Sequence, residues 1–201
     1  MAIAIIIAGL YAYGVWPRPI YNTDIGSLSY EMTEPLTGNA IVEQSFLCDD
    51  KGLESLNIRL SKLDHETMGS YDWQVKEVKS GNIIGKGVLD EKATDNKLFR
   101  SSSPQKNGTV VLSFDKQKDS KGKEYVLSLQ SKEVKEDESM ALYITEKGDA
   151  KSSLKVKGKE LEETSVMKMQ YKRFNVETFI VFLGIVVYLT VFVKFMYKLF
   201  R

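Results

Sequence analysis

Few side chains in this 201-residue sequence could carry out catalysis. His65 is the only histidine and Cys48 is the only cysteine, and His65 lies in the polar segment Asp64–Gly69, which is typical of a solvated loop. A catalytic triad needs a base and a nucleophile that meet in space, which a sequence does not show. A zinc site ordinarily needs three or more His or Cys ligands, and the chain has two such residues in all. We therefore exclude zinc and predict no catalytic residue.

Carboxylates are numerous but scattered along the chain. Asp49 and Asp50 stand next to a predicted turn at Gly52. Their oxygens make them the candidates for a calcium site, with solvated turn residues as the alternative. A glycosidase needs two facing carboxyl groups about 5–9 Å apart, which the sequence does not reveal. Gly85-Lys86-Gly87 has neither P-loop nor dinucleotide-binding spacing. We predict a protein that is not an enzyme and has no cofactor.

Tyr71 and Trp73 are the candidate ligand-binding residues. Aromatic rings on the face of a β-sheet offer flat apolar surfaces on which sugar rings can stack. Tyr71, Trp73 and Val75 alternate along the chain, so they share one face of a predicted strand. Because Val75 favours an inward orientation of that face, a place in the core is the alternative interpretation.

Composition and charge exclude several classes of protein. The chain is 43% hydrophobic and 27% charged, with a net charge of +1. Residues 17–173 hold 25 basic and 26 acidic residues, which is typical of a solvated domain. This balance excludes a strongly basic nucleic-acid-binding protein. A single cysteine excludes an internal disulfide bond.

Short alternating segments between turn signals predict the fold of the middle of the chain. About eight such strands at this spacing indicate an antiparallel β-sandwich. The Cys and Trp pattern of an immunoglobulin domain is absent, so we predict an all-β, jelly-roll-like sandwich. Asn107-Gly108 predicts a hairpin turn rather than a glycosylation site, and Glu91–Leu98 predicts a short helical turn. The predicted strands are Ile41–Cys48, Ser55–Ser61, Tyr71–Val75, Ile83–Leu89, Val110–Phe114, Tyr125–Leu129, Met140–Ile144 and Leu154–Val156.

Apolar segments at both ends predict two transmembrane helices that flank the sandwich. Phe174–Val193 has one charge, Glu177, and would reach about 30 Å as a helix. Met1–Trp16 has no charge and would reach about 24 Å. A cleaved signal peptide is an alternative for Met1–Trp16, and the chain could also be the C-terminal piece of a larger membrane protein. Between the helices we predict a linker at 17–36, the sandwich at 37–157 and a charged stalk at 158–173.

The basic tail at 194–201 predicts the orientation in the membrane. Lys194, Lys198 and Arg201 stand there without an acidic residue. Basic flanks favour the cytoplasmic side. With two spans, both termini would be cytoplasmic and the β-domain extracytoplasmic, at the plasma membrane.

Some strand residues resemble a known kind of module. Gln44-Ser45-Phe46, Gly52-Leu53 and the alternating Leu56–Leu60 are followed later by Lys123–Leu129, with Tyr125, Leu127 and Leu129 in alternation. This pattern, over residues 42–145, resembles the jelly-roll modules in extracytoplasmic parts of bacterial membrane glycosyltransferases and polysaccharide-assembly proteins. The resemblance implies a jelly roll in a setting of cell-envelope glycan assembly. It includes no catalytic motif and implies no transferase activity.

Three functions follow as hypotheses. The first is a membrane-anchored, non-enzymatic module that binds a glycan, or a partner that assembles one, at the cell envelope. The second is a structural subunit that binds another membrane protein. The third is an enzyme that acts on envelope sugars, and a C-terminal fragment of a membrane glycosyltransferase is a further alternative. The predicted partners are the membrane and a glycan or a membrane protein, with no nucleic acid.

Overall fold

The computed structural model describes residues 2–90 and 108–200. Contacts within the chain divide it into two compact units. The larger unit is Pro17–Tyr171, and the smaller one combines Met1–Trp16 with Lys172–Arg201. The turn predicted at Asn107 and the helical turn predicted at Glu91–Leu98 fall on residues outside the described ranges.

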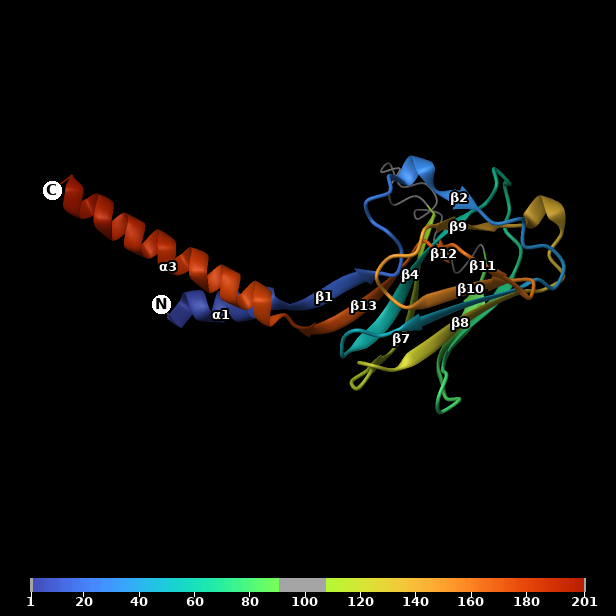
Figure 1. The fold of residues 1–201 in the computed structure, drawn as a ribbon, viewed down its shortest axis with the longest axis horizontal. Coiled ribbons are helices and arrows are strands. Elements are labelled where there is room, and N and C mark those ends of the chain that lie inside the picture. Colours follow the sequence, from blue (N-terminus) through green and yellow to red (C-terminus); the bar gives the residue numbers. More distant parts are fainter. Residues whose placement is uncertain (1, 91–107, 201) are drawn as a thin grey trace. The chain divides into compact units, whose positions relative to one another are not determined.

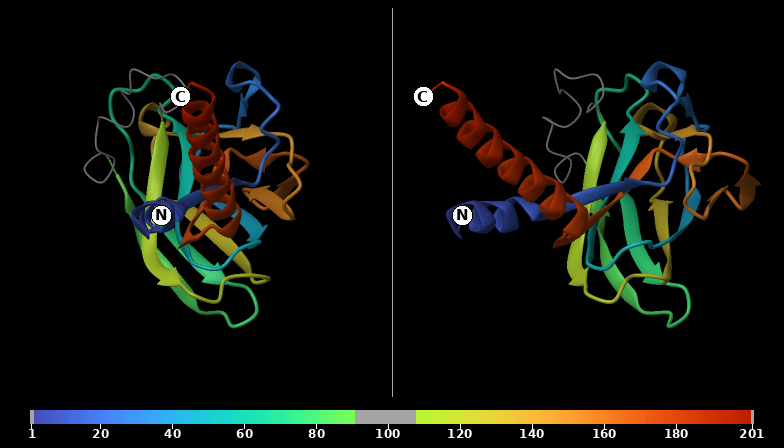
Figure 2. Two further views of the ribbon diagram at one scale, coloured as in Figure 1. Left: turned by 90° about the vertical axis from the view of Figure 1, so that its left-hand side faces the viewer. Right: turned by 60° about the vertical axis from the view of Figure 1, so that its left-hand side comes forward.

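Two antiparallel sheets build the larger unit, and their strands can be followed in Figures 1 and 2. The first sheet has the order β1 (Tyr13–Pro19), β13 (Met167–Phe174), β4 (Leu53–Ser61), β9 (Ala141–Thr145) and β12 (Thr164–Ser165), with β2 (Glu31–Met32) beside β9 and β7 (Thr109–Gln117) beside β4. The second sheet has the order β11 (Lys159–Leu161), β10 (Ser152–Val156), β3 (Ile41–Leu47), β8 (Glu124–Ser131), β5 (Tyr71–Glu77) and β6 (Ile83–Leu89). Two 3-10 turns, η1 (Ser27–Ser29) and η2 (Glu136–Glu138), lie between strands.

One hydrophobic core joins the two sheets. Alternate residues of β4 and β8 point inward because successive side chains of a strand point to opposite faces. The buried side chains come from both sheets, among them Phe46, Leu56, Ile58, Leu60, Tyr71, Val75, Tyr125, Leu127, Leu154, Met169 and Tyr171. The prediction of a mostly-β antiparallel sandwich is confirmed.

The predicted stalk at 158–173 is wrong, because this segment contains β11, β12 and most of β13. Met167, Met169 and Tyr171 are buried and alternate with the exposed Lys168 and Lys172. This alternation was missed in the sequence because the segment also contains many charged residues. The predicted linker at 17–36 likewise contains the fully buried Ile20 and Leu36, so it is part of the sandwich.

The smaller unit corrects the prediction of two flanking transmembrane helices. Helix α3 (Val176–Leu199) has 24 residues, which gives about 36 Å, and its most apolar part has a mean hydropathy of 2.5. Among the described residues it is the only helix long and apolar enough to cross a membrane. Helix α1 (Ala2–Ala12) has 11 residues, or about 16 Å. The chain then turns into β1, where Gly14 is a poor helix former and Val15 and Trp16 favour a strand.

Helices α1 and α3 contact each other within the smaller unit. The rings of Tyr11 and Phe182 lie 5.7 Å apart between centroids, and the Asn175 backbone N–H donates to the Ala12 carbonyl at 2.8 Å. The Asn175 side chain also accepts a hydrogen bond from the Thr178 N–H at 3.1 Å and so caps α3. Since α3 is the one helix among the described residues that is long and apolar enough to cross a membrane, the inference that both termini lie on the same side of a membrane loses its basis.

Candidate ligand-binding site

The structure places Tyr71 and Trp73 in the core. Tyr71 is 0% exposed, and its hydroxyl donates to the Leu36 carbonyl at 3.1 Å and accepts from the Met140 N–H at 3.0 Å. Trp73 is 9% exposed and packs closely against Gly87, where a Cβ would come within 2.7 Å of the indole. Both rings therefore belong to the core, as the alternative interpretation expects. Trp73 also lines a pocket of about 490 Å³ together with Lys86 and Gln130, whereas Tyr71 is enclosed.

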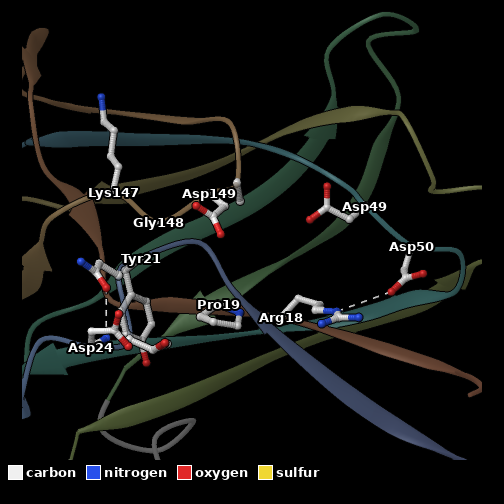
Figure 3. A pocket seen from close by; sticks show the side chains of 12 residues that line it. Arg18, Pro19, Tyr21, Asp24, Asp49, Asp50, Lys147, Gly148 and Asp149 are labelled. Carbon is white, nitrogen blue, oxygen red and sulfur yellow. Dashed lines mark hydrogen bonds and ion pairs between the residues drawn. The ribbon is translucent and has the colours of Figure 1, made fainter. Parts of the chain in front are cut away.

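Asp49 and Asp50 line an acidic pocket of about 830 Å³ at one edge of the larger unit, shown in Figure 3. Asp24 and Asp149 line the same pocket from other segments. Arg18 forms an ion pair with Asp50, with 3.7 Å between Nε and Oδ2. Over residues 2–90 and 108–200, no group of three or more His, Cys, Asp or Glu side chains is close enough to hold a metal ion. The two calcium candidates thus lie in a polar pocket in which one of them already has a cationic partner.

The other reactive side chains do not gather into a site. His65 has its Nδ1 atom 3.0 Å from the Ser139 carbonyl oxygen. Cys48 is 1% exposed, and burial raises the pKa of its thiol to about 12. The His65 ring contacts the Ser139 carbonyl and the Cys48 thiol contacts Tyr171, so the contacts of the described residues give no base–nucleophile pair.

The buried Cys48 gives a direct prediction. Thiol reagents attack the thiolate, and a thiol whose pKa is about 12 is protonated at pH 8. We expect the native protein to react with a disulfide reagent at pH 8 at least about 100-fold more slowly than the same protein in guanidinium chloride. Absorbance of the released thiolate measures both rates. Equal rates would contradict the buried position of Cys48.

A second pocket, of about 590 Å³, was not foreseen from the sequence. Its floor is the outer face of β4, β7 and β13, and its cover is the segment of residues 21–30, which we call the 21–30 loop. Asn57 and Arg59 come from β4, and Lys168 and Gln170 come from β13. Tyr21 and Tyr30 belong to the cover. Every lining residue lies within the larger unit.

Backbone hydrogen bonds fix the 21–30 loop at both ends. Before it, the Ile20 N–H donates to Met167 at 3.1 Å, and near its start the Asn22 N–H donates to Glu146 at 3.0 Å. After the loop, Glu31 and Met32 form β2 and pair with β9. Gly148 lies against the start of the loop, where a Cβ would come within 2.7 Å of the Tyr21 carbonyl oxygen. The cover of the pocket is therefore held in place by the sheet beneath it.

Aromatic rings surround the cation on the pocket floor. The Arg59 guanidinium carbon is 5.6 Å from the centroid of the Tyr30 ring and 4.7 Å from that of Tyr143. Tyr30 is also hydrogen-bonded to Tyr21, and the two rings meet edge to face at 5.9 Å. Burial raises the pKa of both phenols, so both hydroxyls stay protonated at neutral pH. The rings hold the guanidinium in one place and leave two neutral hydroxyls beside it.

Two amides in the pocket have hydrogen-bonding capacity to spare. Asn57 Oδ1 is buried and has no hydrogen-bond partner. The Gln170 side chain is 9% exposed, and no side-chain hydrogen bond joins it to the described part of the chain. An unsatisfied buried polar group costs about 1–3 kcal/mol, so a turn of the Asn57 amide that brought its oxygen to a ligand donor would be favourable.

The sequence pattern indicates the outward orientation of some of the residues that line this pocket. Asn57 and Arg59 alternate with Leu56, Ile58 and Leu60, so the period of two assigns them to the outer face of a strand. Lys168 and Gln170 had no such signal, because their segment was interpreted as a stalk. The cover is irregular, and no sequence pattern indicates that it folds over these side chains.

Comparisons with known proteins leave the family open. No protein-family model matches the chain, and no curated protein matches it. A solved structure of the cysteine protease and lectin-like domains of Cwp84, a surface layer associated protein of Clostridium difficile, is similar at 13% identity and a TM-score of 0.45. The alignment covers 78% of this chain and 36% of that one, so this chain spans about a third of the length of the structure that it matches.

Proposed function

We propose that this chain is a membrane-anchored, non-enzymatic module of the cell envelope that binds a glycan in the pocket beneath the 21–30 loop. The observation that carries the proposal is the lining of this pocket. It combines tyrosine rings, a guanidinium and two amides with spare hydrogen-bonding capacity. Such a set of groups recognises a polyhydroxylated ligand with apolar ring faces.

Different groups in the pocket would make different kinds of contact with a glycan. The amides of Asn57 and Gln170 and the hydroxyls of Tyr30 and Thr109 can each donate or accept hydrogen bonds to sugar hydroxyls. The tyrosine rings supply apolar surface. Among the described residues that line the pocket none is Asp or Glu, so these residues include no carboxylate pair of the kind that a glycosidase uses. This composition supports binding rather than hydrolysis.

In this proposal a membrane anchor determines where the module acts. Helix α3 would hold the sandwich beside the bilayer, which raises its effective concentration at membrane-bound glycans or at enzymes that assemble them. In this proposal the sandwich is a jelly roll on the outer side of the plasma membrane, and the basic residues Lys194, Lys198 and Arg201 lie on the cytoplasmic side. The resemblance to modules of polysaccharide-assembly proteins agrees with this setting.

The test is glycan binding by the full chain in an uncharged detergent, measured on a panel of cell-envelope glycans. We expect Asn57→Leu to weaken binding about tenfold or more. The unfolding free energy should stay the same or rise, because an unsatisfied acceptor is replaced by an apolar group of similar size. Asn82→Leu, at an exposed turn, is the matched control and should bind as the natural chain does.

Two results would overturn the proposal. One is the absence of binding to every glycan on the panel. The other is equal binding by Asn57→Leu and the natural chain. Steady turnover of a labelled glycan would overturn its non-enzymatic part.

A further inference from the structure

We infer that the glycan in the pocket beneath the 21–30 loop carries an acetamido group, as an N-acetylated amino sugar does. This inference rests on the proposed function and names the class of sugar that the pocket takes. Three features of the pocket floor carry it: an amide beside an aliphatic side chain, a second amide on the other side of the first, and the order of these groups across the sheet.

Asn57 and Val111 place an amide and an isopropyl group side by side on the floor. The two residues lie directly opposite each other in the pairing of β4 with β7, and both line the pocket. The Cβ atoms of such a pair are about 4.5–5.5 Å apart. Val111 is 47% exposed, so a ligand in the pocket can contact it. The floor therefore offers a hydrogen-bonding group next to an apolar one.

Gln170 supplies a second amide on the other side of Asn57. In the pairing of β4 with β13, Asn57 lies opposite Lys168, and Gln170 is two residues further along β13. Such diagonal neighbours are about 7–8 Å apart, which is within reach of a long side chain. Gln170 lines the pocket, and its side chain has no hydrogen bond to the described part of the chain. Its amide is thus available to a ligand that lies between these two strands.

The order of these groups across the sheet matches an acetamido group. An acetamido group is a planar, trans secondary amide, so its N–H and its methyl group point to one side and its carbonyl oxygen points to the other. Rotation about the soft terminal torsion of Asn57 would bring the unsatisfied Oδ1 atom to the ligand N–H. The methyl group would then lie on Val111, and the ligand carbonyl would accept from the Gln170 amide. Each part of the acetamido group would have a partner of matching chemistry.

A hydroxyl group at the same position of the sugar would use less of the floor. It is shorter than an acetamido group, so it would meet one amide, and it has no apolar part to cover Val111. Ile25 of the 21–30 loop and Val166 beside β13 add apolar surface to the pocket. This surface favours a methyl group over a hydroxyl, because apolar groups gain free energy when they leave water. The floor would therefore distinguish two sugars that differ in this substituent alone.

The experiment compares two matched glycans by titration calorimetry, with the full chain in an uncharged detergent that has no sugar headgroup. Oligomers of chitin and of cellulose share one backbone and differ only in the acetamido or hydroxyl group on each ring. We expect the chitin oligomer to bind about tenfold or more tightly than the cellulose oligomer. Both probes are uncharged, so this preference should persist in high salt.

Variants of the floor test whether the preference comes from the pocket. Val111→Thr exchanges a methyl group for a hydroxyl at an exposed strand position, so the fold should persist while the preference for the chitin oligomer falls about threefold or more. Val88→Thr, on β6 of the other sheet and 44% exposed, is the matched control and should keep the preference. Gln170→Leu should reduce the preference about tenfold without lowering the unfolding free energy, because it removes no hydrogen bond within the described part of the chain.

The possible failures are distinguishable. Equal binding of the two oligomers would overturn this inference and leave the proposed function standing, and so would binding only to panel glycans without an acetamido group. The absence of binding to every glycan would overturn both. An unchanged preference in both Val111→Thr and Gln170→Leu would also overturn the inference, because the acetamido group would then be recognised elsewhere.

Discussion

Replacing Gln44 with alanine is expected to destabilise the fold by about 3 kcal/mol or more. Gln44 is 0% exposed, and its amide joins three strands. The Nε2 atom donates to the carbonyls of Ser45 and Ser153 at 2.9 Å each. The Oε1 atom accepts from the Thr164 hydroxyl at 3.2 Å and from the Ser165 N–H at 3.0 Å. Truncation would leave several of these groups buried without partners, and each would cost about 1–3 kcal/mol.

Chemical denaturation measures this effect, with Glu43→Ala as the control. Glu43 is the preceding residue of β3 and points to the exposed face of the sheet, so its replacement should change the unfolding free energy by less than about 0.5 kcal/mol. Gln44→Leu keeps most of the side-chain volume but loses the same hydrogen bonds. It should therefore resemble the alanine variant more closely than the natural chain. A loss below about 1 kcal/mol in Gln44→Ala would contradict the role of this amide.

Gly108→Ala is the second substitution with a large expected effect. Gly108 has a φ of +76°, and its carbonyl accepts a hydrogen bond from the Leu60 N–H at 2.8 Å. A Cβ atom at this position would overlap the Leu60 carbonyl oxygen, which is part of the backbone and cannot turn aside. The left-handed conformation alone costs a residue with a Cβ about 1–2 kcal/mol. With the backbone displacement added, we expect a loss of about 3 kcal/mol or more.

Gly122→Ala separates these two contributions. Gly122 also has a φ of +76°, but a Cβ there would meet nothing within 4 Å. Its replacement should cost only the conformational part, about 1–2 kcal/mol. The difference between the two variants in denaturation midpoints then measures the contact with Leu60. Equal losses of unfolding free energy in the two variants would show that the backbone at the edge of β4 moves aside at little energetic cost.

The sequence predicted the sheets more completely than the site. Alternation in segments such as Leu56–Leu60 and Tyr71–Val75 identified strands because one face of each is buried and the other is solvated. Alternation failed in β13, where the exposed Lys168 and Lys172 flank buried residues within a charged segment. The sequence also did not predict that the helix within Met1–Trp16 ends at Ala12, because the whole segment is apolar.

The pocket itself lay beyond sequence patterns for a physical reason. Arg59 could be assigned to an outer face, but its significance depends on Tyr30 and Tyr143, which come from the 21–30 loop and from β9. These contacts join residues that are far apart in the chain. No local propensity or period encodes such contacts, and the irregular 21–30 loop has no period at all.

The pairing of early strands with late ones has a consequence for the rate of folding. In the first sheet Ile58 lies opposite Met167, and in the second sheet Ser45 lies opposite Ser153. Both sheets are thus completed by strands synthesised about a hundred residues after their partners. Such non-local pairing is typical of domains that fold in milliseconds to seconds. During that interval β3 and β4 would expose unpaired edges, and newly made chains would then be most susceptible to aggregation.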